Sequence, residues 1–64
     1  MRDGKRVSVV LVDDNDVMRT LLRGILRAEK EYEVIGEARN GEVGLQMIKR
    51  LKPDLVCLDV LSPP

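Results

Sequence analysis

The sequence contains no histidine, one cysteine (Cys57) and one aromatic residue (Tyr32). A lone cysteine cannot form an internal disulfide, and without histidine or a second cysteine the chain lacks the soft ligands of a zinc-type site. Only oxygen ligands remain for a metal, which favours a hard cation such as magnesium or calcium. Because Cys57 lies inside an apolar run, we interpret it as core filler rather than as a nucleophile.

An excess of charge of one sign and long apolar runs are also absent. Eleven basic and eleven acidic residues give a formal charge of zero, which, with a single aromatic side chain, gives little support for nucleic-acid binding. No apolar run approaches the length of a membrane span, and residues 1–6 lead into no signal-like apolar core. We therefore predict a cytoplasmic protein that contacts neither nucleic acid nor a membrane, with residues 1–6 as a frayed lead-in.

Three short apolar segments predict three β-strands. Residues 7–12 and 55–59 are nearly continuous apolar runs, which is typical of strands that are buried on both faces. Residues 32–38 are more polar, and charged side chains suit a strand at the edge of a sheet. The segments between these strands have helical spacing, and Pro53 is expected to stop the second helix.

The first helix is expected to begin with Asp16 as its N-cap and to close at Lys30 and Glu31. Its apolar residues form two adjacent columns, residues 17, 21 and 25 and residues 18, 22 and 26, which predict a wide apolar stripe. Gly24 is expected to mark close packing of this helix on the sheet.

Three arginines, Arg19, Arg23 and Arg27, recur every fourth residue on another face of the same helix. The favoured interpretation is a solvated basic edge, because charged rows on helices commonly face water. The alternative is a docking face for an acidic partner. The spacing alone leaves both open.

The predicted order is βαβαβ in an α/β fold. Consecutive strands joined by helices are parallel with right-handed crossovers, so the two helices are expected on opposite faces of the sheet. The two apolar strands favour the middle of the sheet and the charged strand an edge. The predicted spatial order of the strands is therefore second-first-third.

Acidic residues end both apolar strands of the predicted sheet. The carboxyl ends of parallel neighbours meet at one edge, which brings Asp13 and Asp14 beside Asp59. Three such carboxylates repel one another unless a cation or a shared proton compensates, and Mg²⁺ is the natural occupant. An aspartate beside a metal is also a competent nucleophile toward phosphorus. Helix capping or a strand end would explain each acid alone but not their joint position. A nucleotide-binding fragment is disfavoured because no glycine-rich phosphate loop is present.

The sequence resembles a response-regulator receiver domain of flavodoxin-like fold. The resemblance lies in VVLVDDN at residues 9–15, ARNGE at 38–42, and KPDLVCLDV at 52–60 followed by Pro63. It implies that Asp59 accepts a phosphoryl group from a histidine kinase or phosphotransfer protein.

The resemblance also implies a ligand set and a partner surface. Asp13, Asp14 and Asp59 would hold Mg²⁺ with the backbone carbonyl of Leu61, and Asp14 would be a direct ligand. In this family the first helix contributes to kinase docking, which makes Arg19 and Arg23 candidate contacts. The chain itself is then expected to be a phosphoacceptor and not an enzyme.

A complete receiver domain is longer, with five strands in the order 2-1-3-4-5. Residues 1–64 are therefore interpreted as its N-terminal half. The serine or threonine and the lysine that end the later strands of the family have no counterpart here, so the chain is expected to be poorly active or inactive in phosphoryl transfer.

The third strand predicts self-association. With no fourth strand beside it, its outer edge would leave backbone groups unpaired and its apolar side chains wet, at about 1.5–3 kcal/mol for each large one. We expect a homodimer or higher oligomer centred on Leu55, Val56, Cys57 and Leu58. The alternative hypothesis for function is a half-domain that only self-assembles in this way, without phosphoryl transfer.

Overall fold

The computed structural model describes residues 5–59, which form three strands and two helices. In chain order these are β1 (Val7–Asp13), α1 (Asp16–Arg27), β2 (Tyr32–Ala38), α2 (Gly41–Leu51) and β3 (Leu55–Asp59). The strands form one parallel sheet in the order β2-β1-β3. The predicted βαβαβ order, the parallel pairing and the central place of β1 are thus confirmed.

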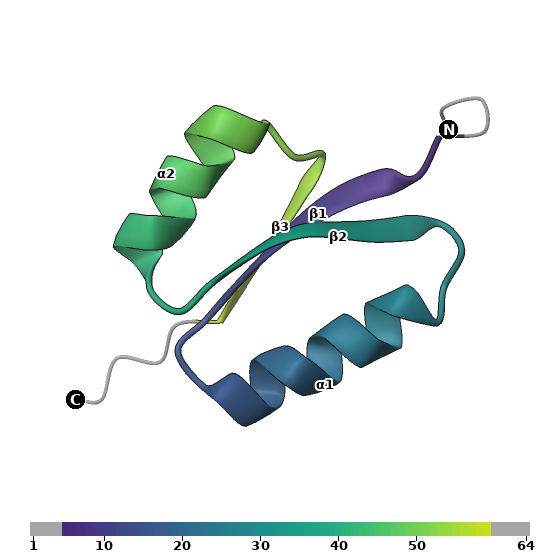
Figure 1. The fold of residues 1–64 in the computed structure, drawn as a ribbon, viewed down its shortest axis with the longest axis horizontal. Coiled ribbons are helices and arrows are strands. Elements are labelled where there is room, and N and C mark those ends of the chain that lie inside the picture. Colours follow the sequence, from purple (N-terminus) through teal and green to yellow (C-terminus); the bar gives the residue numbers. More distant parts are fainter. Residues whose placement is uncertain (1–4, 60–64) are drawn as a thin grey trace.

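The two helices cover opposite faces of the sheet, as Figure 1 shows, with α1 on one side of β1 and α2 on the other. This arrangement follows from two right-handed crossovers that leave the first strand in opposite directions. Neither helix in the described part of the chain combines the length and the apolar character needed to cross a membrane.

The core is centred on β1, whose residues 9–12 are at most 1% exposed. These side chains are buried because β1 has a strand on each edge and a helix over each face. On the α2 face, Val10, Val12 and Ala38 form a cluster against which Val43 and Met47 of α2 pack. The apolar run that predicted a central strand therefore forms the core itself.

Gly44 allows α2 to lie directly on β1. A Cβ atom at this position would lie 2.7 Å from Cγ2 of Val12, closer than side chains approach one another in folded proteins. The predicted close packing at Gly24 of α1 is wrong. A Cβ atom built at Gly24 would have no atom of the sheet within 4 Å. Glycine brings a helix close to the sheet in α2, not in α1.

A β-bulge interrupts the pairing of β1 with β2. Val9 pairs with Val34, but the next residue, Val10, pairs with Gly36, so Ile35 is the extra residue in β2. Beyond the bulge, Glu37 is the partner of Leu11. Since paired residues of neighbouring strands point to the same face, the bulge determines which helix Glu37 faces.

A clip between Ser8 and Asp54 joins the beginnings of β1 and β3. The backbone N–H and the hydroxyl of Ser8 both donate to Oδ2 of Asp54, at 2.9 and 3.0 Å. The backbone N–H of Asp54 in turn lies 2.9 Å from Oγ of Ser8 and 3.0 Å from its carbonyl oxygen. The pairing that follows, from Val9 with Leu55 onward, begins at this clip.

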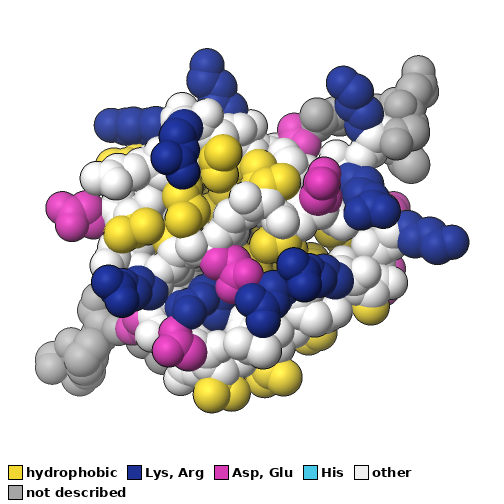
Figure 2. All heavy atoms as spheres, viewed as in Figure 1, with side chains coloured by type: hydrophobic (Ala, Val, Ile, Leu, Met, Phe, Trp, Pro, Cys, Tyr) yellow, Lys and Arg dark blue, Asp and Glu magenta, His cyan; other side chains and the backbone are white. Residues whose placement is uncertain are grey.

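The structure corrects three details of the first helix. The helix ends at Arg27 and not at the predicted Lys30 and Glu31. Its N-cap is Asn15, whose side-chain oxygen accepts from the N–H of Met18 at 2.9 Å, and Asp16 is the first helical residue. The predicted apolar stripe is also too wide. Val17, Leu21 and Ile25 are 55–70% exposed, and Figure 2 shows hydrophobic side chains on the side of α1 that faces away from the sheet.

Candidate functional site

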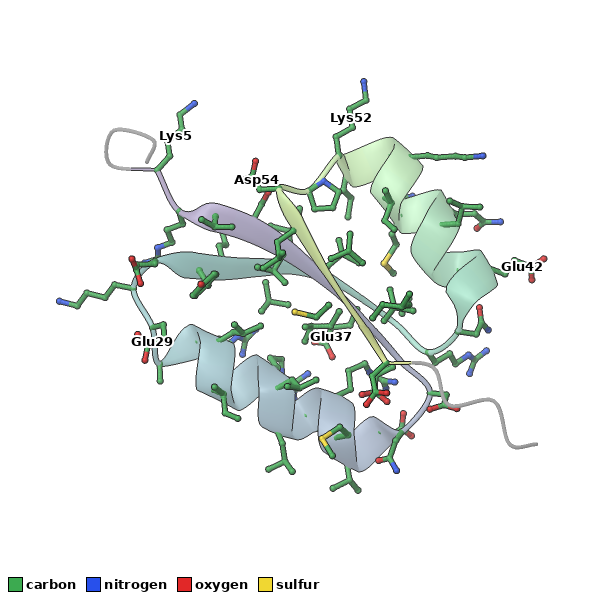
Figure 3. The ribbon with its side chains drawn as sticks, turned by 180° about the vertical axis from the view of Figure 1, so that it is seen from behind. Lys5, Glu29, Glu37, Glu42, Lys52 and Asp54 are labelled. Carbon is green, nitrogen blue, oxygen red and sulfur yellow. The ribbon has the colours of Figure 1, made fainter. Side chains whose placement is uncertain are left out.

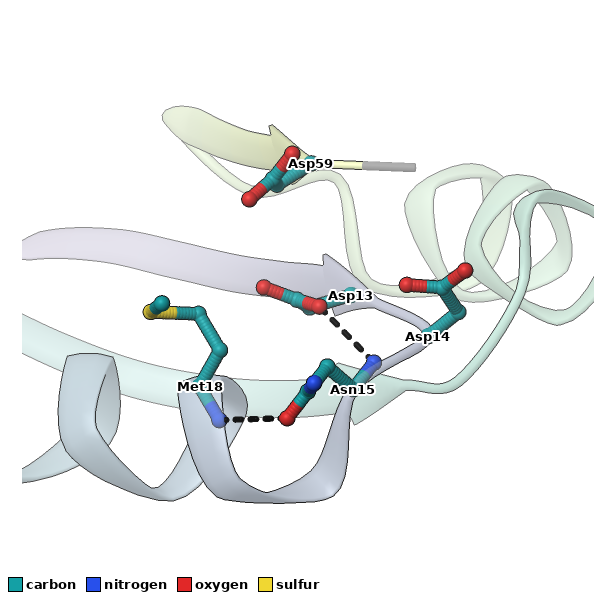
Figure 4. A pocket seen from close by; sticks show the side chains of 5 residues that line it. All are labelled: Asp13, Asp14, Asn15, Met18 and Asp59. Carbon is teal, nitrogen blue, oxygen red and sulfur yellow. Dashed lines mark hydrogen bonds between the residues drawn. The ribbon is translucent and has the colours of Figure 1, made fainter. Parts of the chain in front are cut away.

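The carboxyl ends of β1 and β3 bring two aspartates side by side. Asp13 and Asp59 are direct partners in the parallel register, so their side chains lie on the same face of the sheet. Together with Asp14, Asn15 and Met18 they line an open pocket of about 300 Å³, shown in Figure 4. The three acids that the sequence predicted to meet therefore share one pocket.

Asp13 is the buried member of this group, with 2% of its surface exposed. Its Oδ1 accepts from the backbone N–H of Asn15 at 2.9 Å. Its Oδ2 is buried and has no hydrogen-bond partner within residues 5–59. Buried carboxylate oxygens are nearly always paired, so an unpaired one beside a pocket indicates a place where a cation or water completes the set.

Asp14 and Asp59 are the exposed members of the pocket. Asp14 follows β1 directly, and Asn15 then turns the chain into α1 by capping the helix. Met18, one turn into α1, supplies the apolar wall. The sequence did not predict this role of Met18, although its place three residues after the cap could have indicated it.

The pocket residues fit a hard divalent cation. Carboxylate oxygens are the ligands that Mg²⁺ prefers, and it is commonly held by one or two carboxylates with water filling other positions. Among residues 5–59, no three acidic or cysteine side chains converge closely enough to hold a metal by themselves. The described side chains therefore suit a partly hydrated ion and not a closed protein cage. The predicted backbone ligand, Leu61, lies outside the described residues.

Two of the three arginines on α1 are ion-paired, so the expected solvated basic edge is wrong for them. Nε of Arg19 lies 3.4 Å from Oε1 of Glu37, and Nη1 of Arg23 lies 2.9 Å from Oε2 of the same carboxylate. Glu37 is labelled in Figure 3, between β2 and α1. Arg27 alone of the three is exposed.

The prediction that β3 is buried on both faces is wrong, because the strand is only partly covered. Leu55 and Leu58 are 41% and 68% exposed, whereas Val56 and Cys57 are half-buried. β3 pairs with β1 along one edge, and no other strand within residues 5–59 pairs with its second edge. Cys57 is a free thiol in this setting.

Parallel α/β folds commonly bind their ligands at the carboxyl ends of the strands, and the carboxylate pocket lies at that edge of this sheet. Residues 9–63 match the family model of the response regulator receiver domain. The chain belongs to this family. Its flavodoxin-like strand order, with β1 between β2 and β3, is the order that the resemblance implied.

Known proteins support the same assignment. The chain is similar to the crystal structure of the response regulator domain of Thermotoga maritima CheB, with a TM-score of 0.86 and 30% identity over 92% of this chain and 44% of that one. It is 49% identical to the chemotaxis protein CheY of Halobacterium salinarum over 86% of this chain and 44% of that protein. It is also 49% identical to a protein-glutamate methylesterase/protein-glutamine glutaminase of Bacillus subtilis, over 89% of this chain and 16% of that protein. The chain thus spans less than half the length of each of these relatives.

Proposed function

We propose that this chain is a phosphoacceptor in two-component signalling, in which Asp59 receives a phosphoryl group in the presence of Mg²⁺. An oxygen of the Asp59 carboxylate attacks phosphorus, and the bond from phosphorus to the donor breaks with its electron pair leaving on the donor. Mg²⁺ supplies charge stabilisation to the phosphoryl oxygens. The chain is then the phosphoacceptor in this reaction, and no enzymatic activity is proposed for it.

The pairing of Asp13 with Asp59 carries this proposal. The two residues are direct partners at the end of adjacent strands, and the buried Asp13 leaves one carboxylate oxygen without a partner among the described residues. Asp14 adds a third, exposed carboxylate to the same pocket. An exposed carboxylate can act as the nucleophile, and a neighbouring acid that can hold a cation suits phosphoryl transfer to it.

The proposed donor is the phosphohistidine of a histidine kinase or phosphotransfer protein, and a cytoplasmic location belongs to the same proposal. Docking through Arg19 and Arg23 also stays a prediction. Both guanidinium groups pair with Glu37. Arg23 has more surface to offer a partner, because 35% of its side chain is exposed against 18% for Arg19. The methylesterase activity in the name of one relative is not proposed for this chain, which matches 16% of that protein.

Phosphorylation can be tested with acetyl phosphate as a small donor. We expect slow, Mg²⁺-dependent addition of one phosphoryl group, slow because no cationic side chain lines the pocket within residues 5–59. Intact mass spectrometry counts the groups added, and peptide mapping after reduction of the acyl phosphate locates them.

The Asp59→Asn variant should take up no phosphoryl group. Glu42→Gln is the matched control, because it removes an exposed acid in the first turn of α2 that does not line the pocket. Labelling that persists in Asp59→Asn or that is independent of Mg²⁺ would contradict the proposal.

Self-association through Leu55, Val56, Cys57 and Leu58 also stays a prediction, and it is compatible with phosphoryl transfer. The alternative hypothesis, a half-domain that only self-assembles, is not favoured by the similarity to receiver domains. Sedimentation velocity at micromolar concentration tests the association itself. We expect a dimer or larger species, and a monomer that melts cooperatively would be the opposite result.

A further inference from the structure

Arg19 connects α1 to the backbone of the acidic pocket. Its Nη1 donates to the carbonyl oxygen of Asp13 at 2.8 Å, and its Nη2 pairs with the carboxylate of Asp16. Only 18% of the side chain is exposed. The guanidinium group therefore fixes the peptide unit that joins Asp13 to Asp14, the two acids that follow one another in the pocket.

Glu37 holds this arginine from the other side. Its carboxylate forms an ion pair with Arg19 through Oε1 and accepts a hydrogen bond from Arg23 through Oε2, and 26% of its side chain is exposed. The β-bulge at Ile35 turns Glu37 toward α1 by making it the partner of Leu11. The result is a continuous connection from β2 through Arg19 to the end of β1.

We propose that Arg19 is a positioning residue for the acidic pocket, holding the Asp13–Asp14 turn in the conformation that binds Mg²⁺. This inference rests on the proposed metal-dependent function. Arg19 reaches the backbone carbonyl of Asp13 and not its carboxylate, so the unpaired Oδ2 stays available to a cation. Groups that orient metal ligands in this indirect way commonly change metal affinity by about 10–100-fold when removed.

Arginine is suited to this position because its planar fork offers five donors in a fixed geometry. Asp13, Asp16 and Glu37 each contact a different nitrogen of Arg19. A lysine would keep the positive charge, but its single ammonium group could not make all three of these contacts at once. The conservative variant therefore separates geometry from charge.

The experiment compares Arg19→Met with Arg23→Met, and the affinity for Mg²⁺ is measured by titration while amide chemical shifts are followed. Both variants remove one positive charge and one ion pair with Glu37, but only Arg19 touches Asp13. We expect the Mg²⁺ dissociation constant of Arg19→Met to rise about 10–100-fold and that of Arg23→Met to change less than about threefold. Arg19→Lys should still bind Mg²⁺ more weakly than the unaltered chain does.

The sign of the change separates positioning from simple electrostatics. Loss of a nearby positive charge alone would tighten Mg²⁺ binding, because one repulsive cation is gone. Equal affinity in both methionine variants, tighter binding in Arg19→Met, or full recovery in Arg19→Lys would each overturn the inference. Thermal melting of each variant shows whether it is folded at the temperature of the titration.

A second measurement needs no metal. Hydrogen exchange at the amides of Asp14 and Asn15 should be faster in Arg19→Met than in Arg23→Met, because the turn has lost its anchor. Unchanged exchange at these amides overturns the positioning role. If the unaltered chain binds no Mg²⁺ while exchange changes as expected, the proposed function fails and the positioning role stands.

Discussion

Replacement of Asp13 by asparagine is expected to weaken Mg²⁺ binding by at least about tenfold, or about 1.4 kcal/mol, and to raise the melting temperature of the metal-free chain. The two effects have one cause. Asp13 is 2% exposed and its Oδ2 has no partner in the described residues, and a buried charged group with an unpaired oxygen destabilises the folded state.

Asparagine removes this charge and can still accept from the N–H of Asn15 through its side-chain oxygen. The gain in stability should be about 0.5–2 kcal/mol, the usual size for a single stabilising substitution. For a domain of this size each kcal/mol corresponds to a shift of roughly 4–8 °C in melting temperature. The metal ligand is lost with the charge.

Asp14→Asn is the matched control for this prediction. Asp14 lines the same pocket but is exposed, so water already compensates its charge. Its substitution should weaken Mg²⁺ binding without raising the melting temperature by a comparable amount. If Asp13→Asn melts at a lower temperature than the unaltered chain without metal, Asp13 contributes to folding in a way that its missing partner does not explain.

Replacement of Leu11 by alanine is expected to unfold most of the chain at 25 °C or to lower its melting temperature by at least about 10 °C. Leu11 has no exposed surface and is the largest fully buried side chain among residues 5–59. Truncation of such a leucine costs about 2–5 kcal/mol, partly for lost burial and partly for the cavity left behind. A chain of 64 residues has little stability in reserve.

Circular dichroism during heating measures this effect. Leu45→Ala is the control, because Leu45 lies on α2 and is 52% exposed, so its truncation should change the melting temperature little. Similar melting of the two variants would mean that β1 is not the centre of the core in solution.

The strands and their order could be predicted because buried strands leave a clear pattern of apolar residues in the sequence. Residues 9–12 are apolar without interruption, and such a short run is typical of a strand covered on both faces. Once β1 and β3 are parallel neighbours, the meeting of Asp13 with Asp59 follows from topology. The site was predictable to the extent that strand ends determine it.

The contacts of α1 could not be predicted in the same way. Two apolar columns compete for the sheet in the sequence, and the crossing of the helix over the sheet decides that residues 17, 21 and 25 face outward. The choice of Asn15 over Asp16 as the cap is a shift by one residue between two good capping side chains. The ion pairs of Arg19 and Arg23 depend on where β2 presents Glu37, which no local pattern indicates.

The bulge at Ile35 shifts the alternation of side chains in β2 by one residue. Without the extra residue, strict alternation would send Glu37 into the apolar layer beneath α2 and turn Ala38 toward the arginines of α1. The length of β2 between Val34 and Glu37, as well as the identity of its residues, therefore decides that the carboxylate meets its cations. An alignment that treats β2 as a regular strand would therefore assign Glu37 to the wrong side of the sheet.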